Sequence, residues 1–226
     1  MDKIVGPGNV YVVAAKQVVA SNVDVDFAAG PSEVLVLADD SADPDFIAAD
    51  LLAQAEHDQD AATVLVTTSE ELALKVRELV RTMLQKNPRW QIALRALGKY
   101  GRVVVARDFD EAVEFTNAYA PEHLELMVKR PEQTLKHIKN AGAIFLGSYS
   151  PVAAGDFAVG PNHILPTGGA ARRRSGLSVL DFVRLPTVQE LTKRGLKRAA
   201  VVAEKLAELE GLPGHAQSIK KRLKGG

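Results

Sequence analysis

Residues 34–37 read Val-Leu-Val-Leu, an apolar run without polar alternation that is followed by a well-marked helix start. Asp43 suits the N-cap of that helix, Pro44 fits its first position, and Asp45 favours the positive end of the helix dipole. A strand that is apolar on both faces is typical of a parallel sheet covered by helices on each side. The run therefore predicts one strand and one helix of an α/β fold.

The same alternation of apolar strand and amphipathic helix continues along the chain. Further strands are predicted at residues 63–66, 103–105, 124–128 and 143–146, with helices through 72–83, from 108 to about 119, and from 131 onward. These steps predict a Rossmann-like parallel sheet with helices on both faces. They occupy roughly residues 28 to 150, in a domain that we expect to extend over residues 28–185.

A glycine-rich segment follows the last predicted strand. Residues 147–176 contain six Gly and three Pro and show little periodicity, so we expect a long loop without regular structure. Ligands of open α/β sheets bind outside the carboxyl ends of the strands. The loop starts at that edge, and the sequence therefore predicts a binding site there.

The two ends of the chain differ from this domain. Residues 1–27 contain a turn signal at 6–9 and a helix predicted over 10–19. Residues 186–226 predict a C-terminal helical tail, in which a helix over 188–210 ends at the Gly211-Leu212-Pro213-Gly214 break and a basic stretch follows.

Composition excludes several classes of protein. The 28 basic and 28 acidic side chains cancel, so no global field attracts nucleic acid or an anionic membrane. The chain has no Cys, which excludes disulfides, thiolate metal sites and a thiol nucleophile. No apolar run approaches the roughly 20 residues of a membrane span, and the N-terminus does not resemble a signal peptide. We expect a cytoplasmic protein with no nucleic-acid partner and no membrane contact.

Polar side chains stand at positions that local structure does not require. Gln54 and His57 fall near the end of the helix that starts at Pro44, one turn apart on the same face. A hydrogen-bonded structural pair is the commoner explanation of such residues. Glu122 and His123 follow Pro121, so a loop is predicted for them, and an adjacent carboxylate and imidazole suit acid–base catalysis.

Three more histidines and two carboxylates complete this set. Asp156 and His163 lie in the glycine-rich segment, Glu210 and His215 border the break in the tail, and His137 is an ordinary helix residue. Gln54, His57, Asp156 and His215 form an oxygen and nitrogen donor set suited to zinc, although spacing alone leaves such a site unproven. Glycine-rich dinucleotide and Walker signatures and the His-Glu-x-x-His motif are absent.

Seven stretches, in order and with their spacing, resemble the histidinol dehydrogenase family. They are residues 3–9, Ala29 to Val36, Asp50 to Asp58, Ala120 to Leu126, Gly142 to Gly147, Gly155 to Thr167, and Ser175 to Val179. The family oxidises L-histidinol to L-histidine through an aldehyde, histidinal, in two NAD-dependent steps. A zinc ion orients the substrate.

The resemblance implies a role for each matching residue. Gln54, His57, Asp156 and His215 are implied as zinc ligands, and these four together with Ser32, His123, His163 and Glu210 as substrate contacts. Asn9 matches a residue that contacts NAD, although its local sequence favours a plain turn into a helix. The resemblance also implies a homodimer in which His215 and Glu210 cross the interface.

The same resemblance implies the division of labour between Glu122 and His123. His123 takes the alcohol proton as hydride leaves for NAD, and Glu122 then activates water to attack the aldehyde. Two adjacent bases suit two successive proton abstractions, and hydride transfer belongs to the nicotinamide.

The chain has roughly half the length usual for this family, and the half that supplies most NAD contacts is absent from it. Residues 1–27 would then be the remnant of a second, NAD-contacting domain. The alternatives are a fragment of a genuine dehydrogenase, which we favour, one half of a split enzyme, or a zinc- and imidazole-binding remnant without turnover. A dehydrogenase of another small polar alcohol and a metal-dependent hydrolase rank lower.

Overall fold

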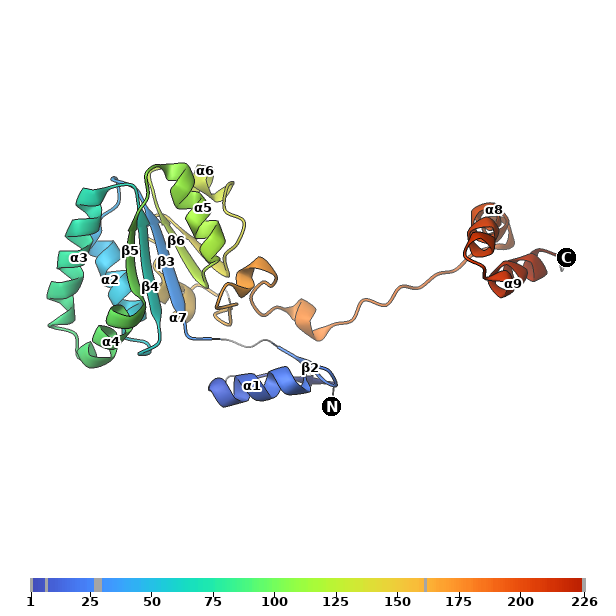
Figure 1. Ribbon diagram of the computed structural model, residues 1–226, viewed down its shortest axis with the longest axis horizontal. Coiled ribbons are helices and arrows are strands. Elements are labelled where there is room, and N and C mark those ends of the chain that lie inside the picture. The colour runs from blue at the N-terminus through green and yellow to red at the C-terminus, as the bar shows by residue number, and fades with distance from the viewer. Residues whose placement is uncertain (1, 7, 27–29, 161, 225–226) are drawn as a thin grey trace. The chain divides into compact units, whose positions relative to one another are not determined.

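The computed structural model describes residues 2–6, 8–26, 30–160 and 162–224 (Figure 1). Its centre is a five-stranded sheet in the order β5-β4-β3-β6-β7. The strands are β3 (Glu33–Ala38), β4 (Ala62–Thr67), β5 (Gly101–Val105), β6 (His123–Met127) and β7 (Ala143–Leu146). Every neighbouring pair is parallel, so the α/β fold predicted from the alternating pattern is confirmed.

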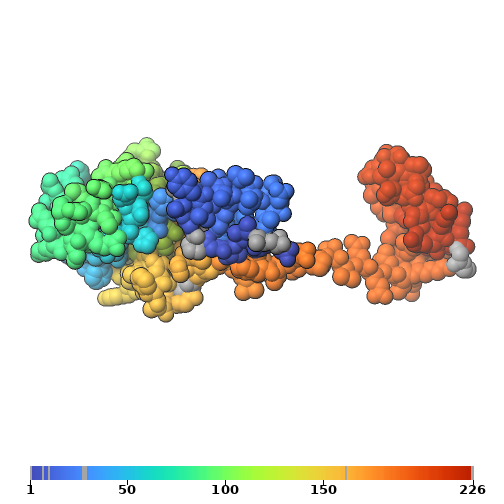
Figure 2. Space-filling view, turned by 90° about the horizontal axis from the view of Figure 1, so that it is seen from below, coloured from blue at the N-terminus to red at the C-terminus, as the bar shows by residue number. Residues whose placement is uncertain are grey.

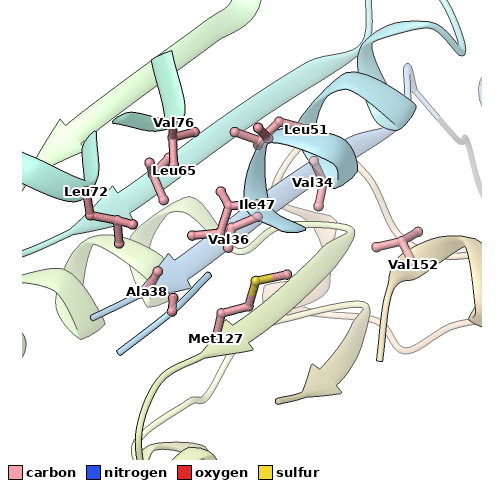
Figure 3. Close-up of a cluster of buried hydrophobic side chains, with 12 residues drawn as sticks. Val34, Val36, Ala38, Ile47, Leu51, Leu65, Leu72, Val76, Met127 and Val152 are labelled. Carbon is pink, nitrogen blue, oxygen red and sulfur yellow. The ribbon is translucent and has the colours of Figure 1, made fainter. Parts of the chain in front are cut away.

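Helices cover both faces of this sheet (Figure 1). One face carries α2 (Pro44–Ala55), α3 (Glu70–Leu84) and α4 (Trp90–Tyr100), and the other carries α5 (Phe109–Tyr119) and α6 (Pro131–Leu135). Because side chains alternate along a strand, Val34 and Val36 pack under α2 while Leu35 and Leu37 pack under α5. Figure 3 shows the first cluster, with Ile47 over β3. The helix α4 was not predicted from the sequence.

The helix α2 starts as predicted and ends earlier than predicted. Asp43 caps it by accepting a hydrogen bond from the Asp45 amide at 2.9 Å, and Pro44 occupies its first turn. It ends at Ala55, so His57 lies in the turn beyond it and donates its amide to the Gln54 carbonyl at 3.2 Å. The prediction that His57 continues the helical face is therefore wrong.

A small parallel pair of strands stands at the N-terminus. β1 (Lys3–Ile4) and β2 (Asp24–Val25) flank α1 (Val10–Val19), whose bounds match the predicted helix. The Lys16 ammonium contacts the Asp26 carboxylate at 2.6 Å, with both side chains buried. The sequence analysis did not predict these two short strands.

The glycine-rich segment contains regular structure, contrary to the prediction of a plain loop. It holds α7 (Val152–Phe157) and the short 3-10 turn η1 (Ala170–Arg172), and η2 (Val179–Phe182) follows it. Figure 2 shows the yellow part that follows β7 on the surface of the sheet unit. The segment then returns to the start of β3, where Gly168 donates its amide to the Glu33 carboxylate at 2.6 Å.

The chain divides into two compact units, Met1–Phe182 and Val183–Gly226. The second unit is a pair of packed helices, α8 (Lys193–Leu209) and α9 (Pro213–Lys224). The predicted helix over 188–210 begins five residues later than expected, because Thr192 caps it through the Gly195 amide at 3.1 Å. The basic stretch after the break lies in α9. Among the described residues, no helix is long and apolar enough to cross a membrane.

Candidate active site

The two adjacent acid–base residues lie at the amino edge of the sheet. His123 is the first residue of β6 and pairs with Val34 of β3, and both Glu122 and His123 are buried. The prediction of a loop is correct for Glu122 and wrong for His123. The helix before them ends at Tyr119 as predicted, and Ala120 completes the turn with a left-handed backbone, φ 56°.

Backbone groups of Glu33 hold this pair. The Glu33 amide donates to Glu122 Oε2 at 2.8 Å, and the Glu33 carbonyl lies 2.9 Å from His123 Nδ1. A carbonyl oxygen only accepts, so the neutral imidazole carries its proton on Nδ1. The other nitrogen, Nε2, then has a free lone pair and is a base.

The surroundings of His123 Nε2 fit a proton acceptor. This atom is buried and has no hydrogen-bond partner, while Asp156 Oδ1 lies 3.7 Å from it. Burial lowers the pKa of His123, but Glu122, the Glu33 carbonyl and Asp156 together outweigh burial and raise that pKa above its usual value. The Glu122 carboxylate lies 3.4 Å from Nδ1 and balances the positive ring. A proton taken at Nε2 is thereby stabilised.

Two glycines allow the close packing around the pair. A Cβ at Gly142 would lie 2.6 Å from the Glu122 carbonyl oxygen, and a Cβ at Gly155 would lie 2.5 Å from the Phe145 ring. That ring lies 6.1 Å from the His123 imidazole, centroid to centroid. The packing around Glu122 and His123 therefore requires residues without a side chain at positions 142 and 155.

The other residues predicted for the first unit lie on separate elements. Gln54 is buried in the last turn of α2, and Asp156 in α7 has its side chain one-third exposed. Ser32 is half-buried before β3, while His57 and His163 are exposed. The structure thus brings Glu122, His123 and Asp156 together in the first unit.

Asn9 already has a local structural role. It is the N-cap of α1, and its side-chain oxygen accepts from the Tyr11 amide at 3.0 Å and the Val12 amide at 3.3 Å. The plainer explanation of the Gly6-to-Asn9 turn, a tight start to the helix, fits this geometry. An NAD contact by Asn9 stays a prediction.

Glu210 and His215 belong to the second unit. Glu210 is the C-cap of α8 and His215 lies in the first turn of α9. Both line a cavity of about 390 Å³ between these helices, together with apolar residues such as Leu206 and Leu212. The remaining two residues of the predicted site therefore share one pocket.

The donor set suits zinc by its chemistry, because imidazole and oxygen ligands are among those that zinc accepts. Its members are spread over α2, the following turn, α7 and α9. Within the described parts of the chain, no three His, Asp or Glu side chains converge closely enough to hold a metal ion. The four-ligand zinc site therefore stays a prediction.

Two residues of the site escaped the sequence analysis. Glu33 acts through its backbone, which no side-chain pattern reveals. Glu125 is buried in the middle of β6, accepts from the Val152 amide at 3.0 Å, and leaves its Oε2 without a hydrogen-bond partner. Its sequence position could have revealed it, because a carboxylate is unusual in a strand that is expected to be covered on both faces.

Glu122, His123 and Asp156 lie at the amino ends of the strands, opposite to the carboxyl ends at which a binding site was predicted. The glycine-rich segment leaves the carboxyl end of β7, but α7 brings Asp156 back beside His123 at the start of β6. Fold and geometry together describe an α/β protein with a buried imidazole between two carboxylates, an arrangement that suits acid–base catalysis.

Comparison with known proteins narrows this class. The profile of the histidinol dehydrogenase family matches residues 1–223. Histidinol dehydrogenase of Methanothermobacter thermautotrophicus is 55% identical over 99% of this chain and 53% of its own length. That of Aquifex aeolicus is 50% identical over 98% of this chain and 52% of its own. The chain belongs to the histidinol dehydrogenase family, which is a family of oxidoreductases, as the seven stretches predict.

Solved structures agree with this assignment. The crystal structure of histidinol dehydrogenase from Elizabethkingia anophelis matches with a TM-score of 0.95 at 45% identity, over 99% of this chain and 52% of that one. An acetylating aldehyde dehydrogenase from Geobacillus thermoglucosidasius shares the fold, with a TM-score of 0.54 at 14% identity. The chain spans about half the length of the curated relatives it matches.

Proposed function

We propose that this chain carries the substrate and acid–base half of an enzyme that oxidises L-histidinol to L-histidine, through histidinal, with two molecules of NAD. The observation that carries the proposal is His123, whose Nε2 is a buried base without a partner and lies beside Asp156. Family membership supplies the substrate class.

In the first oxidation, His123 Nε2 takes the hydroxyl proton of the alcohol while a hydride leaves the adjacent carbon. NAD, when bound, accepts that hydride. Glu122 and Asp156 stabilise the imidazolium, since their carboxylates lie 3.4 Å and 3.7 Å from its two nitrogens. The Glu33 carbonyl keeps the ring in one tautomer and one orientation.

In the second oxidation, Glu122 takes a proton from a water molecule that adds to the aldehyde. The resulting hydrate anion would give a second hydride to the second molecule of NAD, and the carboxylic acid so formed would release its proton to solvent and become the carboxylate. Glu122 suits this role because its Oε2 is fixed by the Glu33 amide at 2.8 Å and the side chain is buried.

We also propose that Gln54, His57, Asp156 and His215 hold a zinc ion, which would orient the amine and imidazole of the substrate. Gln54 and Asp156 offer oxygen, and the two histidines offer nitrogen. Ser32, His163 and Glu210 are the proposed additional contacts with the substrate, and Asn9 the proposed contact with NAD.

The proposed assembly is a homodimer in which the second unit of one chain completes the site of its partner. The helix α8 supports this, because it exposes Val201, Val202, Leu206 and Leu209. A two-helix unit with such an apolar face gains stability by covering it. Glu210 and His215 lie in that same unit.

The test supplies the part of the enzyme that this chain does not span. The half of the Methanothermobacter thermautotrophicus relative that this chain does not span is mixed with this chain, Zn²⁺, L-histidinol and NAD. The formation of NADH is followed by absorbance. Turnover by the unchanged chain should exceed that of the His123→Ala chain by about a hundredfold or more. Equal rates for the two chains overturn the proposal.

A second candidate function is a zinc-dependent binding module for imidazole compounds without turnover. The length of the chain, about half that of its relatives, favours it. Calorimetry of the chain alone with L-histidinol, with and without Zn²⁺, separates the two functions. Zinc-dependent heat without NADH formation in the mixture supports the binding module, and no zinc-dependent heat contradicts it.

A further inference from the structure

The buried Glu125 lies one layer beneath the proposed site. Side chains alternate along β6, so His123, Glu125 and Met127 point to the same face of the sheet. Met127 lies in the apolar cluster under α2 (Figure 3), and His123 stands at the amino edge. Glu125 is therefore placed between the core and the site, at 1% exposure.

Glu125 contacts the helix that carries Asp156. Its Oε1 accepts from the Val152 amide at 3.0 Å, at the start of α7. Asp156 follows Val152 by four residues, which is about one helical turn, so both lie on the same side of α7. The hydrogen bond thus fixes the distance between β6 and the turn that presents Asp156 to His123.

The second oxygen of Glu125 relates it to α2. This Oε2 is buried and has no hydrogen-bond partner. Burial, and after it the charge of Asp50, raise the pKa of Glu125 to about 8, while the Val152 amide and His123 act in the opposite direction. Asp50, whose charge contributes to this shift, lies on α2. Gln54 follows Asp50 by four residues.

We propose that Glu125 is a positioning residue that ties β6 to α7 beneath His123 and Asp156, through its buried hydrogen bond with the Val152 amide. Val152 lies one helical turn before Asp156, and Glu125 lies one strand repeat after His123. The hydrogen bond between β6 and α7 exists without any ligand. Only its expected effect on Zn²⁺ binding rests on the proposed function.

The test uses variants of the full chain that separate polarity from volume. Glu125→Gln keeps an oxygen for the Val152 amide, whereas Glu125→Leu keeps only a similar volume. Val152→Pro removes the amide donor at a helix position that accepts proline, with Val152→Ala as its control for lost packing. Val113→Ala, on the opposite face of the sheet, reports general destabilisation.

Two measurements apply to each variant. Amide hydrogen exchange in α7 reports the tie without metal, and competition with a coloured chelator reports Zn²⁺ affinity. Glu125→Leu and Val152→Pro should speed exchange in α7 and weaken Zn²⁺ binding by about tenfold or more. Glu125→Gln, Val152→Ala and Val113→Ala should keep both values within about threefold of the unchanged chain.

The outcomes distinguish the tie from the proposed function. Unchanged exchange in Glu125→Leu and in Val152→Pro overturns the tie. Faster exchange with unchanged Zn²⁺ affinity overturns the positioning role. An unchanged chain that binds no Zn²⁺ contradicts the proposed zinc site instead, and hydrogen exchange then still decides whether the tie exists.

Discussion

At the scale of single residues, the imidazole of His123 shows how burial and partners together set chemistry. A buried histidine without acceptors would lose its proton affinity, because desolvation disfavours the charged ring. Here a carbonyl on one nitrogen and carboxylates near both nitrogens reverse that effect. The dipeptide Glu122-His123 alone indicated acid–base chemistry. The Glu33 backbone, whose amide donates to Glu122 and whose carbonyl accepts from His123, cannot be recognised from residue patterns.

The glycine at position 142 gives a prediction about packing. Gly142→Ala should lower the free energy of unfolding by about 1–3 kcal/mol, since the new Cβ meets the backbone of Glu122. Gly98→Ala in α4 is the matched control, because nothing lies within 4 Å of its Cβ, and it should raise stability by about 0.8 kcal/mol. Urea unfolding measures both, and two changes of the same sign would contradict the packing described around Glu122.

The raised pKa of Glu125 gives a prediction about pH. The folded state holds this proton up to about pH 8, whereas the unfolded chain releases it near 4.5. The stabilising contribution of the neutral group is complete below pH 4.5 and is lost as the pH rises toward about 8. Burial also raises the pKa of Asp50, to about 6. The stabilising contribution of its neutral form is therefore lost at a lower pH than that of Glu125, as the pH rises toward about 6.

Glu125→Gln removes the titration and keeps the shape of the side chain. Its stability relative to the unchanged chain should therefore increase by about 2–4 kcal/mol between about pH 5 and about pH 8. Urea unfolding across this range measures the difference. A difference that stays constant with pH would show that Glu125 is ionised in the folded protein at neutral pH.

At the scale of elements, the start of α2 could be read from the sequence because Asp43, Pro44 and Asp45 act locally. The end of α2 could not, since it depends on the turn in which Asp58 accepts the Asp60 amide at 2.8 Å. The helix α4 escaped prediction for a similar reason: its N-cap, Arg89, makes no capping hydrogen bond through its side chain. Helix starts with a clear capping residue could thus be predicted from the sequence, and those without one could not.

The cap of α2 gives a prediction at this scale. Asp43→Ala should lower the free energy of unfolding by about 1 kcal/mol, because the Asp45 amide loses its acceptor. Asp43→Asn keeps the acceptor and should change stability by less than about 0.5 kcal/mol. Thermal unfolding followed by circular dichroism compares the two, and equal losses would mean that the charge of Asp43 matters rather than its hydrogen bond.

At the scale of the whole molecule, the sheet could be predicted and the place of the site could not. The order of apolar runs and helices is sufficient for a parallel sheet, since each run pairs with others of its kind. The path of the chain after β7 depends on long-range contacts, such as Gly168 with Glu33. For that reason the edge expected from the general rule for open sheets is the wrong one for Glu122, His123 and Asp156.

The proposed homodimer gives a prediction about assembly. Leu209→Lys places a charge on the apolar face of α8, where Leu209 is 75% exposed, and should shift the chain from dimer to monomer in sedimentation velocity. Gln91→Lys adds the same charge to the exposed surface of α4 and should leave the dimer intact. A monomeric unchanged chain, or equal dissociation in both variants, would contradict the role of α8.

The hydrogen bonds that hold Glu122 and His123 have a consequence for the effect of mutations at position 33. Glu33 supports the pair through an amide and a carbonyl, which nearly every amino acid supplies equally. A point mutation at that codon can therefore change the side chain and leave the anchor in place, except a change to proline, which has no amide hydrogen. Only an insertion or deletion that slides β3 against β6 would remove both bonds together. Most single-nucleotide mutations at the codon of residue 33 thus keep the support of Glu122 and His123, whereas mutations at the codons of the pair change the proposed reacting groups themselves.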